Sequence, residues 1–318
     1  MPENYALSDV DRRILNLLLI EGAHLSESHI AEKLKLNQTT INYKLRNLWD
    51  KHVITGTYYR LNPLKFGLPG MAWLFIKLNR NAHFGVLKKG LLEHRNVFSI
   101  KAIAGGNDLL VKIFYEDDRA LSAFLLWMET TYKKEIDHRS LSIVLDRYKM
   151  HRTRLDDEKY FTKTRLSKLD KDLIRARFEK PLLNFKEISE MLGAHRNTVA
   201  QRWNRLLDER VIMKKGIDVN PVYLPQLNAG ISLVLLIDAE TGRTAEAAEY
   251  LSGFPDIHLV TTISAGHDLL GILRHKDVAG AYDFMRNVYT CDAIKKTRSV
   301  LVYSEMLKQW GHDFAPFI

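Results

Sequence analysis

The chain has 318 residues, of which 46% are hydrophobic and 27% charged, and its formal net charge is +9 at pH 7. At roughly 100–200 residues per domain, this length predicts about two domains with hydrophobic cores. The composition excludes a disordered or fibrous protein. The single cysteine, Cys291, excludes a disulfide framework and every cysteine-rich zinc site.

The apolar runs are too short to cross a bilayer, since 71–76 and 231–237 are among the longest. Acidic residues at positions 3, 9 and 11 are unlike a signal peptide. We therefore expect a cytoplasmic protein with no membrane partner.

Positive charge avoids the last quarter of the chain. The net charge is +3 for each of 8–66, 67–145 and 146–166, +4 for 167–225 and −3 for 226–318. Binding of a polyanion such as nucleic acid would account for this distribution. A generic basic surface is the alternative explanation.

Residues 1–66 are predicted to form a winged helix-turn-helix. The apolar spacing favours a helix over 11–20, and Ser26 or Ser28 is a suitable N-cap for a second helix. Asn37 is a suitable N-cap for a third helix, and 53–60 reads as a pair of strands turned at Gly56.

Residues 67–145 alternate strands with helices. Strands are predicted at 71–78, 97–104, 108–115 and 140–145, with helices at 86–93 and 119–132. The order βαββαβ is that of a ferredoxin-like domain. The highly charged stretch 146–166 that follows is predicted to be a linker.

The same pattern then recurs. With a shift of 158 residues, 8 of the 25 positions in 30–54 match, and a shift of 160 places 106–110 on 266–270. The repeat predicts a second winged helix-turn-helix at 167–225 and a second ferredoxin-like domain at 226–318. The second domain's strands are expected at 231–237, 258–264, 268–273 and 298–303, with helices at 245–251 and 278–288. The expected fold is α+β, with two winged helix-turn-helix domains alternating with two ferredoxin-like βαββαβ domains.

The third helix of each helical unit carries side chains suited to reading DNA. With its apolar residues turned inward, the first copy leaves five residues outward: Gln38, Thr39, Asn42, Tyr43 and Arg46. The second copy leaves out Arg196, Asn197, Ala200, Gln201 and Arg205. Arginine, asparagine and glutamine make bidentate contacts to guanine and adenine. For phosphates, the wings offer Tyr58, Tyr59, Arg60, Lys214 and Lys215. The alternative is that these are simply solvated helix faces.

The chain resembles the Lrp/AsnC (feast/famine) regulators. The stretches that carry the resemblance are Leu36-Asn37-Gln38-Thr39-Thr40-Ile41, Val53-Ile54 with Leu61-Asn62-Pro63, and Gly105-Gly106-Asn107-Asp108-Leu109-Leu110. It covers both copies, so the chain looks like a tandem fusion of two such units. The resemblance implies double-stranded DNA as a partner, oligomerisation through the βαββαβ domains, and binding of a small effector, such as an amino acid, near the glycine turn.

The residues carried over for this effector are Gly105, Gly106, Asn107, Asp108, Gly266, His267 and Asp268. The second copy departs from the family pattern, because it has Ala265 where the first has Gly105. The alternative for these turns is structural, with the glycines serving a tight connection and the aspartates capping it.

An enzyme is the main rival interpretation. The chain has no P-loop, no G-x-G-x-x-G, no H-E-x-x-H and no G-x-S-x-G motif. We assign no catalytic residue, no metal and no cofactor. Sirohaem decarboxylases resemble Lrp/AsnC units too, but their His-Asn-Tyr-x-Arg-like strand motif is missing from 258–262 and from 99–102. A DNA-architectural protein without an effector is the third reading.

Overall fold

Two groups of three helices are built in the same way. A computed structural model describes residues 5–22, 26–180, 183–227 and 230–307. The first helical unit contains α1 (Asp9–Glu21), α2 (Glu27–Leu34) and α3 (Gln38–Asp50), and the second contains α6 (Lys168–Glu179), α7 (Phe185–Leu192) and α8 (Arg196–Asp208). Ser8 and Ser167 start α1 and α6 with the same capping box, which satisfies backbone N–H groups of the first turn.

Each helical unit is followed by a single strand, β1 (Ile54–Leu61) or β7 (Ile212–Val219). These strands pair with each other in antiparallel register, with Arg60 opposite Lys214. The prediction that 53–60 forms its own hairpin turned at Gly56 is therefore wrong. Gly56 lies inside β1 at an irregularity of the ladder, opposite Asp218. The partner strand lies about 160 residues further along the chain, beyond the reach of a local pattern.

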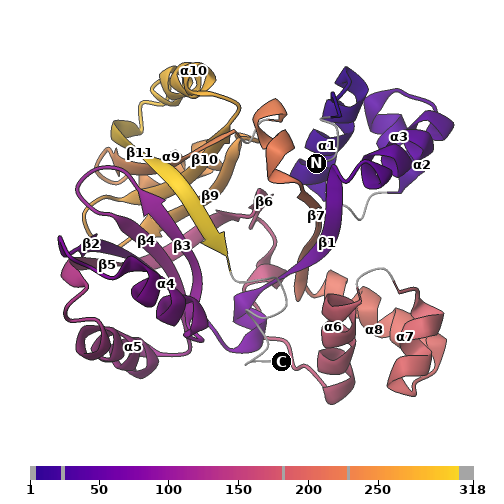
Figure 1. The fold of residues 1–318 in the computed structure, drawn as a ribbon, viewed down its shortest axis with the longest axis horizontal. Helices are drawn as coiled ribbons and strands as arrows, with labels where there is room; N and C mark the ends of the chain where they lie inside the picture. Colours follow the sequence, from indigo (N-terminus) through magenta and orange to yellow (C-terminus); the bar gives the residue numbers. More distant parts are fainter. Residues whose placement is uncertain (1–4, 23–25, 181–182, 228–229, 308–318) are drawn as a thin grey trace.

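In the β1–β7 ribbon, each strand packs against the helical unit of the other half of the chain. Tyr59 of β1 packs edge-to-face on Trp203 of α8, with ring centroids 5.0 Å apart. Ile217 of β7 is buried in the core of the first helical unit with Ile14 and Leu48. Figure 1 shows the two helical units on either side of this ribbon. Each unit thus completes its core with a strand that follows the other.

The rest of the chain supplies two βαββαβ sets. The first is β2 (Gly70–Leu78), α4 (Phe84–Glu93), β3 (Val97–Ile103), β4 (Leu109–Tyr115), α5 (Asp118–Thr131) and β5 (Ile136–Met150). The second is β8 (Ile231–Ala239), α9 (Thr244–Ser252), β9 (Ile257–Ile263), β10 (Leu269–His275), α10 (Val278–Val288) and β11 (Ile294–Leu307). The strands and helices predicted from periodicity are all present, with longer last strands.

The two βαββαβ sets join into one closed structure. The strand order is β2-β4-β3-β11-β8-β10-β9-β5-β6, where β6 is Thr153–Arg154, and β2 also pairs with β5. Eight antiparallel strands therefore close into a barrel, joined across the sets by β3–β11 and β5–β9. The helices cover the outside, α4 and α5 on one side and α9 and α10 on the other (Figure 1).

The barrel interior is filled by inward-pointing side chains such as Trp73, Phe98, Phe114 and Leu270. The predicted linker 146–166 is wrong over its first residues, because β5 continues to Met150 and buries Arg147 and Lys149. Beyond β6, the stretch contains one 3-10 turn, Glu158–Tyr160. Further 3-10 turns, Pro63–Phe66 and Pro221–Gln226, follow β1 and β7.

Candidate functional site

Helix α3 presents its predicted readers to solvent. Ile41 and Leu48 are buried, while Gln38, Thr39 and Arg46 are exposed and Tyr43 is 68% exposed. Asn42 is half-buried, and its Oδ1 has no hydrogen-bond partner. Asn37 stands at the N-cap position without a side-chain capping hydrogen bond.

Helix α8 presents a different set. Arg196, Asn197 and Gln201 are exposed as expected. The prediction that Arg205 points outward to DNA is wrong. Its guanidinium donates to the buried Asp170 carboxylate at 3.0 Å and contacts Glu209 at 3.4 Å. Asn204 of α8 is also exposed, although the helical pattern had not placed it among the outward residues. The 158-residue shift could have identified it, since it places Asn204 on Arg46.

A buried carboxylate holds each third helix. Asp170 contacts Arg202 at 3.5 Å as well as Arg205, and in the first unit Asp11 contacts Lys44 at 3.3 Å. Asp11 also accepts a hydrogen bond from Tyr5. Both aspartates are the acidic members of the capping boxes of α1 and α6, with no exposed surface. The third helices are thus fixed to the first helices by ionic clamps.

The residues predicted to contact phosphate from the wings lie instead in the β1–β7 ribbon, where they have partners within the chain. Lys214 is buried, and its Nζ donates to the carbonyls of Leu19 and Ile20 at 2.8 and 2.6 Å. Burial and the neighbouring Arg152 lower the pKa of Lys214 to about 7. Lys215 lies over the Tyr59 ring, 5.8 Å from its centroid.

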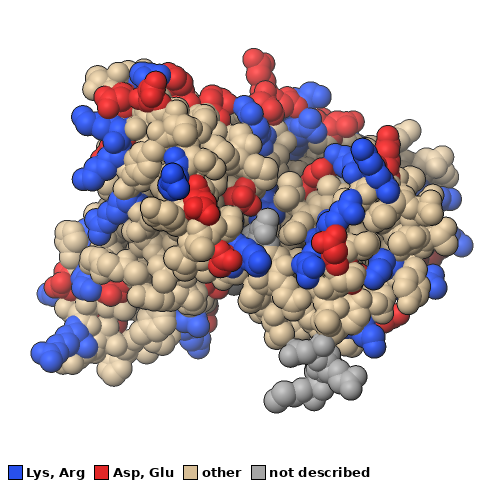
Figure 2. Space-filling view, turned by 90° about the horizontal axis from the view of Figure 1, so that it is seen from above, with Lys and Arg blue, Asp and Glu red and all other residues tan. Residues whose placement is uncertain are grey.

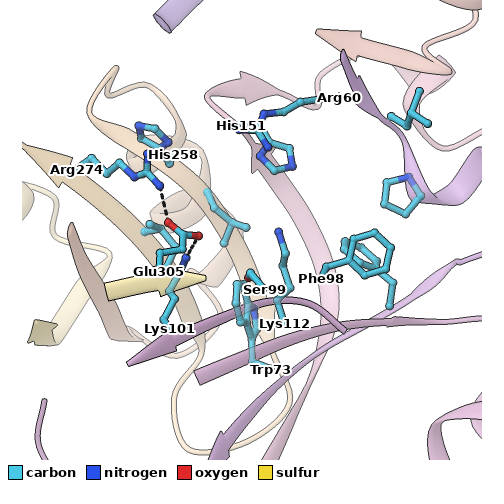
Figure 3. Close-up of a pocket in the computed structure, with 15 residues that line it drawn as sticks. Arg60, Trp73, Phe98, Ser99, Lys101, Lys112, His151, His258, Arg274 and Glu305 are labelled. Atoms are coloured by element: carbon cyan, nitrogen blue, oxygen red, sulfur yellow. Dashed lines mark hydrogen bonds and ion pairs between the residues drawn. The ribbon is translucent and has the colours of Figure 1, made fainter. Parts of the chain in front are cut away.

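The Arg60 side chain extends toward His151 at the pocket (Figure 3). It donates to the Tyr58 hydroxyl at 3.1 Å. In the face shown in Figure 2, lysine and arginine intermingle with aspartate and glutamate, so the coloured residues there form no uniform basic patch.

The glycine turns lie where the two βαββαβ sets meet. Ala104 in the first turn donates its N–H to the Leu301 carbonyl of β11, and Ser264 at the second donates to Ile143 of β5. Gly105 has a φ of +97°, whereas in the second turn the positive φ of +82° is at Gly266. The second turn therefore avoids left-handed strain at Ala265 by moving the glycine position.

The aspartates of these turns have structural partners. Asp108 accepts the Leu78 N–H at 2.7 Å and Lys77 Nζ at 3.1 Å. Asp268 accepts the Ala239 N–H at 2.9 Å. His267 Nδ1 lies 2.7 Å from Asp238. The two carboxylates thus bind the ends of the neighbouring strands β2 and β8, and Asp108 also pairs with the ammonium group of Lys77.

A cationic pocket opens at the opposite strand ends. It has a cavity volume of about 70 Å³ and lies between the start of β3 and β9 and the end of β4, β10 and β11. Glu305 forms ion pairs with Lys101 and with Arg274, the second at 2.5 Å (Figure 3). Burial would raise the pKa of Glu305, but these two cations lower it below its usual range.

The bases of this pocket are also perturbed. Burial, reinforced by Arg60 and Lys112 around one ring and Arg152 and Arg274 around the other, lowers the pKa of His151 and of His258 well below that of free histidine. Burial likewise lowers the pKa of Lys101. No feature of the sequence pattern indicated this pocket, because its residues come from many separate strands.

No helix in the described ranges is both long and apolar enough to span a membrane. Within the same part of the chain, no three histidine, cysteine, aspartate or glutamate side chains gather as metal ligands.

The N-terminal helical unit matches a known family of DNA-binding domains. Residues 7–55 match the family model described as winged helix-turn-helix DNA-binding. The chain is 30% identical over 123 residues to the HTH-type transcriptional regulator AldR of Mycolicibacterium smegmatis, covering 38% of this chain and 71% of AldR. It is 28% identical over 153 residues to an HTH-type transcriptional regulator of Pyrococcus horikoshii, covering 47% of this chain and 92% of that protein.

Among solved structures, the sirohaem decarboxylase NirDL has a similar fold over the whole chain. The TM-score is 0.62 at 12% identity, covering 96% of this chain and 97% of NirDL. At that identity the likeness concerns the fold alone.

Proposed function

We propose that this chain, which belongs to the Lrp/AsnC family of HTH-type transcriptional regulators, uses both α3 and α8 to bind DNA. As a family member it is a DNA-binding transcriptional regulator. The single observation that carries the proposal is that each third helix is clamped to a buried aspartate while its polar face stays exposed.

This proposal includes a division of the chain. Residues 1–66 and 167–225 act as winged helix-turn-helix domains, and 67–145 and 226–318 as ferredoxin-like domains, with a connector in 146–166. The homo-oligomer expected from the family needs other surfaces, because the edges β3, β11, β5 and β9 pair inside the chain. Light scattering tests whether the chain forms an oligomer, because an oligomer would have a multiple of the 36.8 kDa mass of one chain.

The two helices read different sequences in this proposal. Gln38 and Arg46 of α3 correspond to Arg196 and Asn204 of α8, so the base contacts differ. We expect one chain to recognise two unlike half-sites, about one helical turn apart or a multiple of that. Footprinting on selected genomic fragments tests this expectation. A perfectly palindromic footprint would show that only one helix per chain contacts bases.

The effector, such as an amino acid, is proposed to bind between a glycine turn and the last strand of the other βαββαβ set. The supporting observation is the position of each turn at that junction. A calorimetric screen of amino acids with and without DNA tests it, using Asn107→Ala and His267→Ala as variants. DNA binding that responds to no amino acid would favour the architectural alternative.

A second candidate function is a sirohaem-decarboxylase-like activity. It is favoured by the fold likeness to NirDL over the whole chain and by the two histidines of the pocket. Anaerobic incubation with sirohaem, followed by measurement of carbon dioxide release, tests it. We expect no release above a His258→Phe variant; release that depends on His258 would establish the enzyme.

A further inference from the structure

The connector between the two halves carries a basic segment beside α8. Residues 159–169 contain four basic and no acidic side chains. Three of the cations, Lys159, Lys163 and Arg165, are exposed and line a groove of about 390 Å³ that extends to Arg205 on α8. The carboxylate in the described lining, Glu209, pairs with Arg205 at 3.4 Å. The net positive charge of this groove therefore comes from the connector.

The backbone of this segment is held in place by the turn after β1. Lys65 is buried, and its Nζ donates to the Thr162 carbonyl at 2.6 Å and to the Thr164 hydroxyl at 3.1 Å. Asn62 donates its side-chain N–H to the Tyr160 carbonyl at 2.7 Å. A segment fixed in this way loses little conformational freedom when a partner binds. Its exposed cations are thus preorganised.

The charged groups of the segment are not paired within the described part of the chain. None of Lys159, Lys163 and Arg165 forms an ion pair there. The segment makes its contacts through its backbone: the Lys159 N–H donates to Asp157 at 2.9 Å, and the Arg165 carbonyl accepts from Arg205 at 3.3 Å. The ammonium and guanidinium groups are therefore available to an anionic partner.

A comparison of the two helical units shows that these cations are not needed for packing. Aligning the serines that start α1 and α6 places Ala6 on Arg165 and Leu7 on Leu166. Leu7 is buried in the core of the first unit, and Leu166 packs against the core that contains the second. Ala6 and Arg165 are both exposed. Residues 1–7 contain no lysine or arginine, so the positive charge is specific to the second unit.

The groove lies where a DNA backbone is expected if α8 reads bases. Arg205 follows Arg196 by nine residues on α8, which is about 14 Å along a helix at 1.5 Å per residue. The major groove of DNA is about 12 Å wide. When the N-terminal residues of α8 contact base edges, its last turn therefore lies close to the phosphates that border the major groove. Lysine and arginine bind such phosphates and position a protein on the duplex without reading sequence.

We propose that segment 159–165 binds the phosphate backbone of double-stranded DNA beside the half-site read by α8. This inference rests on the proposed function, because it takes α8 as a DNA-reading helix. Lys159, Lys163 and Arg165 contact phosphates that border the groove between the segment and α8. The first unit has no counterpart of these contacts, so the half-site read by α8 is held by more backbone contacts than the half-site read by α3.

The salt dependence of DNA binding tests the proposal. Fluorescence anisotropy is measured at several salt concentrations for the full chain, with its selected operator and with a random-sequence duplex of equal length. Each phosphate contact contributes about 0.9 to the slope of log K against log salt, so the connector variant Lys159→Gln/Lys163→Gln/Arg165→Gln should lose about 2–3 from the slope. It should bind both duplexes about 10–100-fold more weakly near 0.15 M salt, with the parent's ratio of operator to random affinity.

A charge-matched variant is the control. Arg119→Gln/Lys133→Gln/Lys134→Gln removes three exposed cations from α5 and the turn after it, so the two triple variants have the same net charge. Figure 1 shows α5 at the opposite end of the molecule from α6–α8. The control should keep the parent's slope. If the connector variant keeps it too, or if both variants lose the same amount, the proposal is wrong.

A single substitution tests the same surface if the connector variant is less stable than the parent. Arg165→Ala introduces the residue that the first unit has at the corresponding position, Ala6. It should unfold at the parent's temperature and lower the slope by about 0.9. An unchanged slope would exclude Arg165 from contact with phosphate and overturn the proposal.

The random-sequence duplex separates this inference from the regulator function. If the parent binds both duplexes equally, sequence reading by α3 and α8 fails, and the slopes still report whether segment 159–165 contacts phosphates. If the connector variant loses its preference for the operator but keeps its affinity for random DNA, the segment reads bases and the phosphate proposal is wrong.

Discussion

Inside the barrel, the first βαββαβ set supplies Lys101 where the second supplies Thr261. The equivalent ladders show the contrast directly: Lys101 of β3 pairs with Glu305 of β11, and Thr261 of β9 pairs with Arg147 of β5. Arg147 lies 5.6 Å from the centroid of the Phe114 ring. The β3–β11 junction therefore contains an ionic network, whereas at the β5–β9 junction the cation lies over an aromatic ring.

The helical units differ less in their support than in their exposed residues. Asp11 and Asp170 occupy the same place in the capping boxes and hold the third helix in both units. The exposed residues of α3 and α8 are different. The two halves thus share their backbone and their ionic clamps, whereas the residues available to a ligand are specific to each half.

The largest expected effect comes from the exchanged strand contacts. Tyr59→Ala should destabilise α6–α8 by about 4 kcal/mol, because it removes a buried ring from the core around Trp203. Ile217→Val, at the corresponding position of β7, should cost about 1 kcal/mol in α1–α3. Native-state hydrogen exchange measures each unit. If Tyr59→Ala lowered the stability of α1–α3 alone, β1 would not be contributing to the core of the second helical unit.

The clamps should differ in strength. Asp170→Ala removes the carboxylate from two arginines and should destabilise the second helical unit by about 3 kcal/mol. Asp11→Ala removes the carboxylate from one cation, Lys44, and should lower the free energy of unfolding of the first helical unit by about 2 kcal/mol. Hydrogen exchange of α8 and α3 provides the measurement. Equal losses would show that the second arginine adds nothing.

Substitutions in α3 and α8 should affect different half-sites of the operator. Arg196→Ala and Arg46→Ala should each weaken operator binding by about 1–3 kcal/mol at fixed salt, and each should relax the sequence at one half-site only. Arg119→Ala, an exposed arginine on α5, is the control and should bind as the parent does. Fluorescence anisotropy on half-site variants checks this. If both substitutions relax the same half-site, the two helices are not independent readers.

Periodicity and capping predicted most elements because these signals are local. Ser26, one of the two candidate N-caps, caps α2, and β3 and β4 coincide with short apolar runs on either side of a glycine turn. The β1–β7 ribbon was missed because the hydrogen bonds of β1 go to residues about 160 positions away.

Site residues were predicted less well. The helical spacing placed Arg205 outward but could not show that the buried Asp170 lies within its reach. The cationic pocket combines residues from seven strands, the 3-10 turn after β1 and one hairpin turn, and no spacing in the sequence brings them together.

The smallest effect concerns pH. The folded-state pKa values of His151 and His258 are lowered, so below the ordinary histidine pKa the unfolded chain binds more protons and stability falls as pH falls. The two histidines together should cost about 1 kcal/mol between pH 7 and pH 6. The 160-residue shift places Phe98 at the position of His258, so His258→Phe should remove about half of this loss. Thermal unfolding across this pH range measures it, and an unchanged slope would exclude His258 as a source.

The exchanged ribbon also sets the order of events during synthesis. The core of the first helical unit includes Ile217, Tyr223 and Leu227, which the ribosome adds long after α3. At about 5–20 residues per second, the helices α1–α3 wait roughly 10–30 s for these residues. During that interval the apolar faces that later meet β7 are uncovered in the nascent chain. A pause in translation before residue 227 should therefore prolong the period in which the first half is open to chaperones and to aggregation.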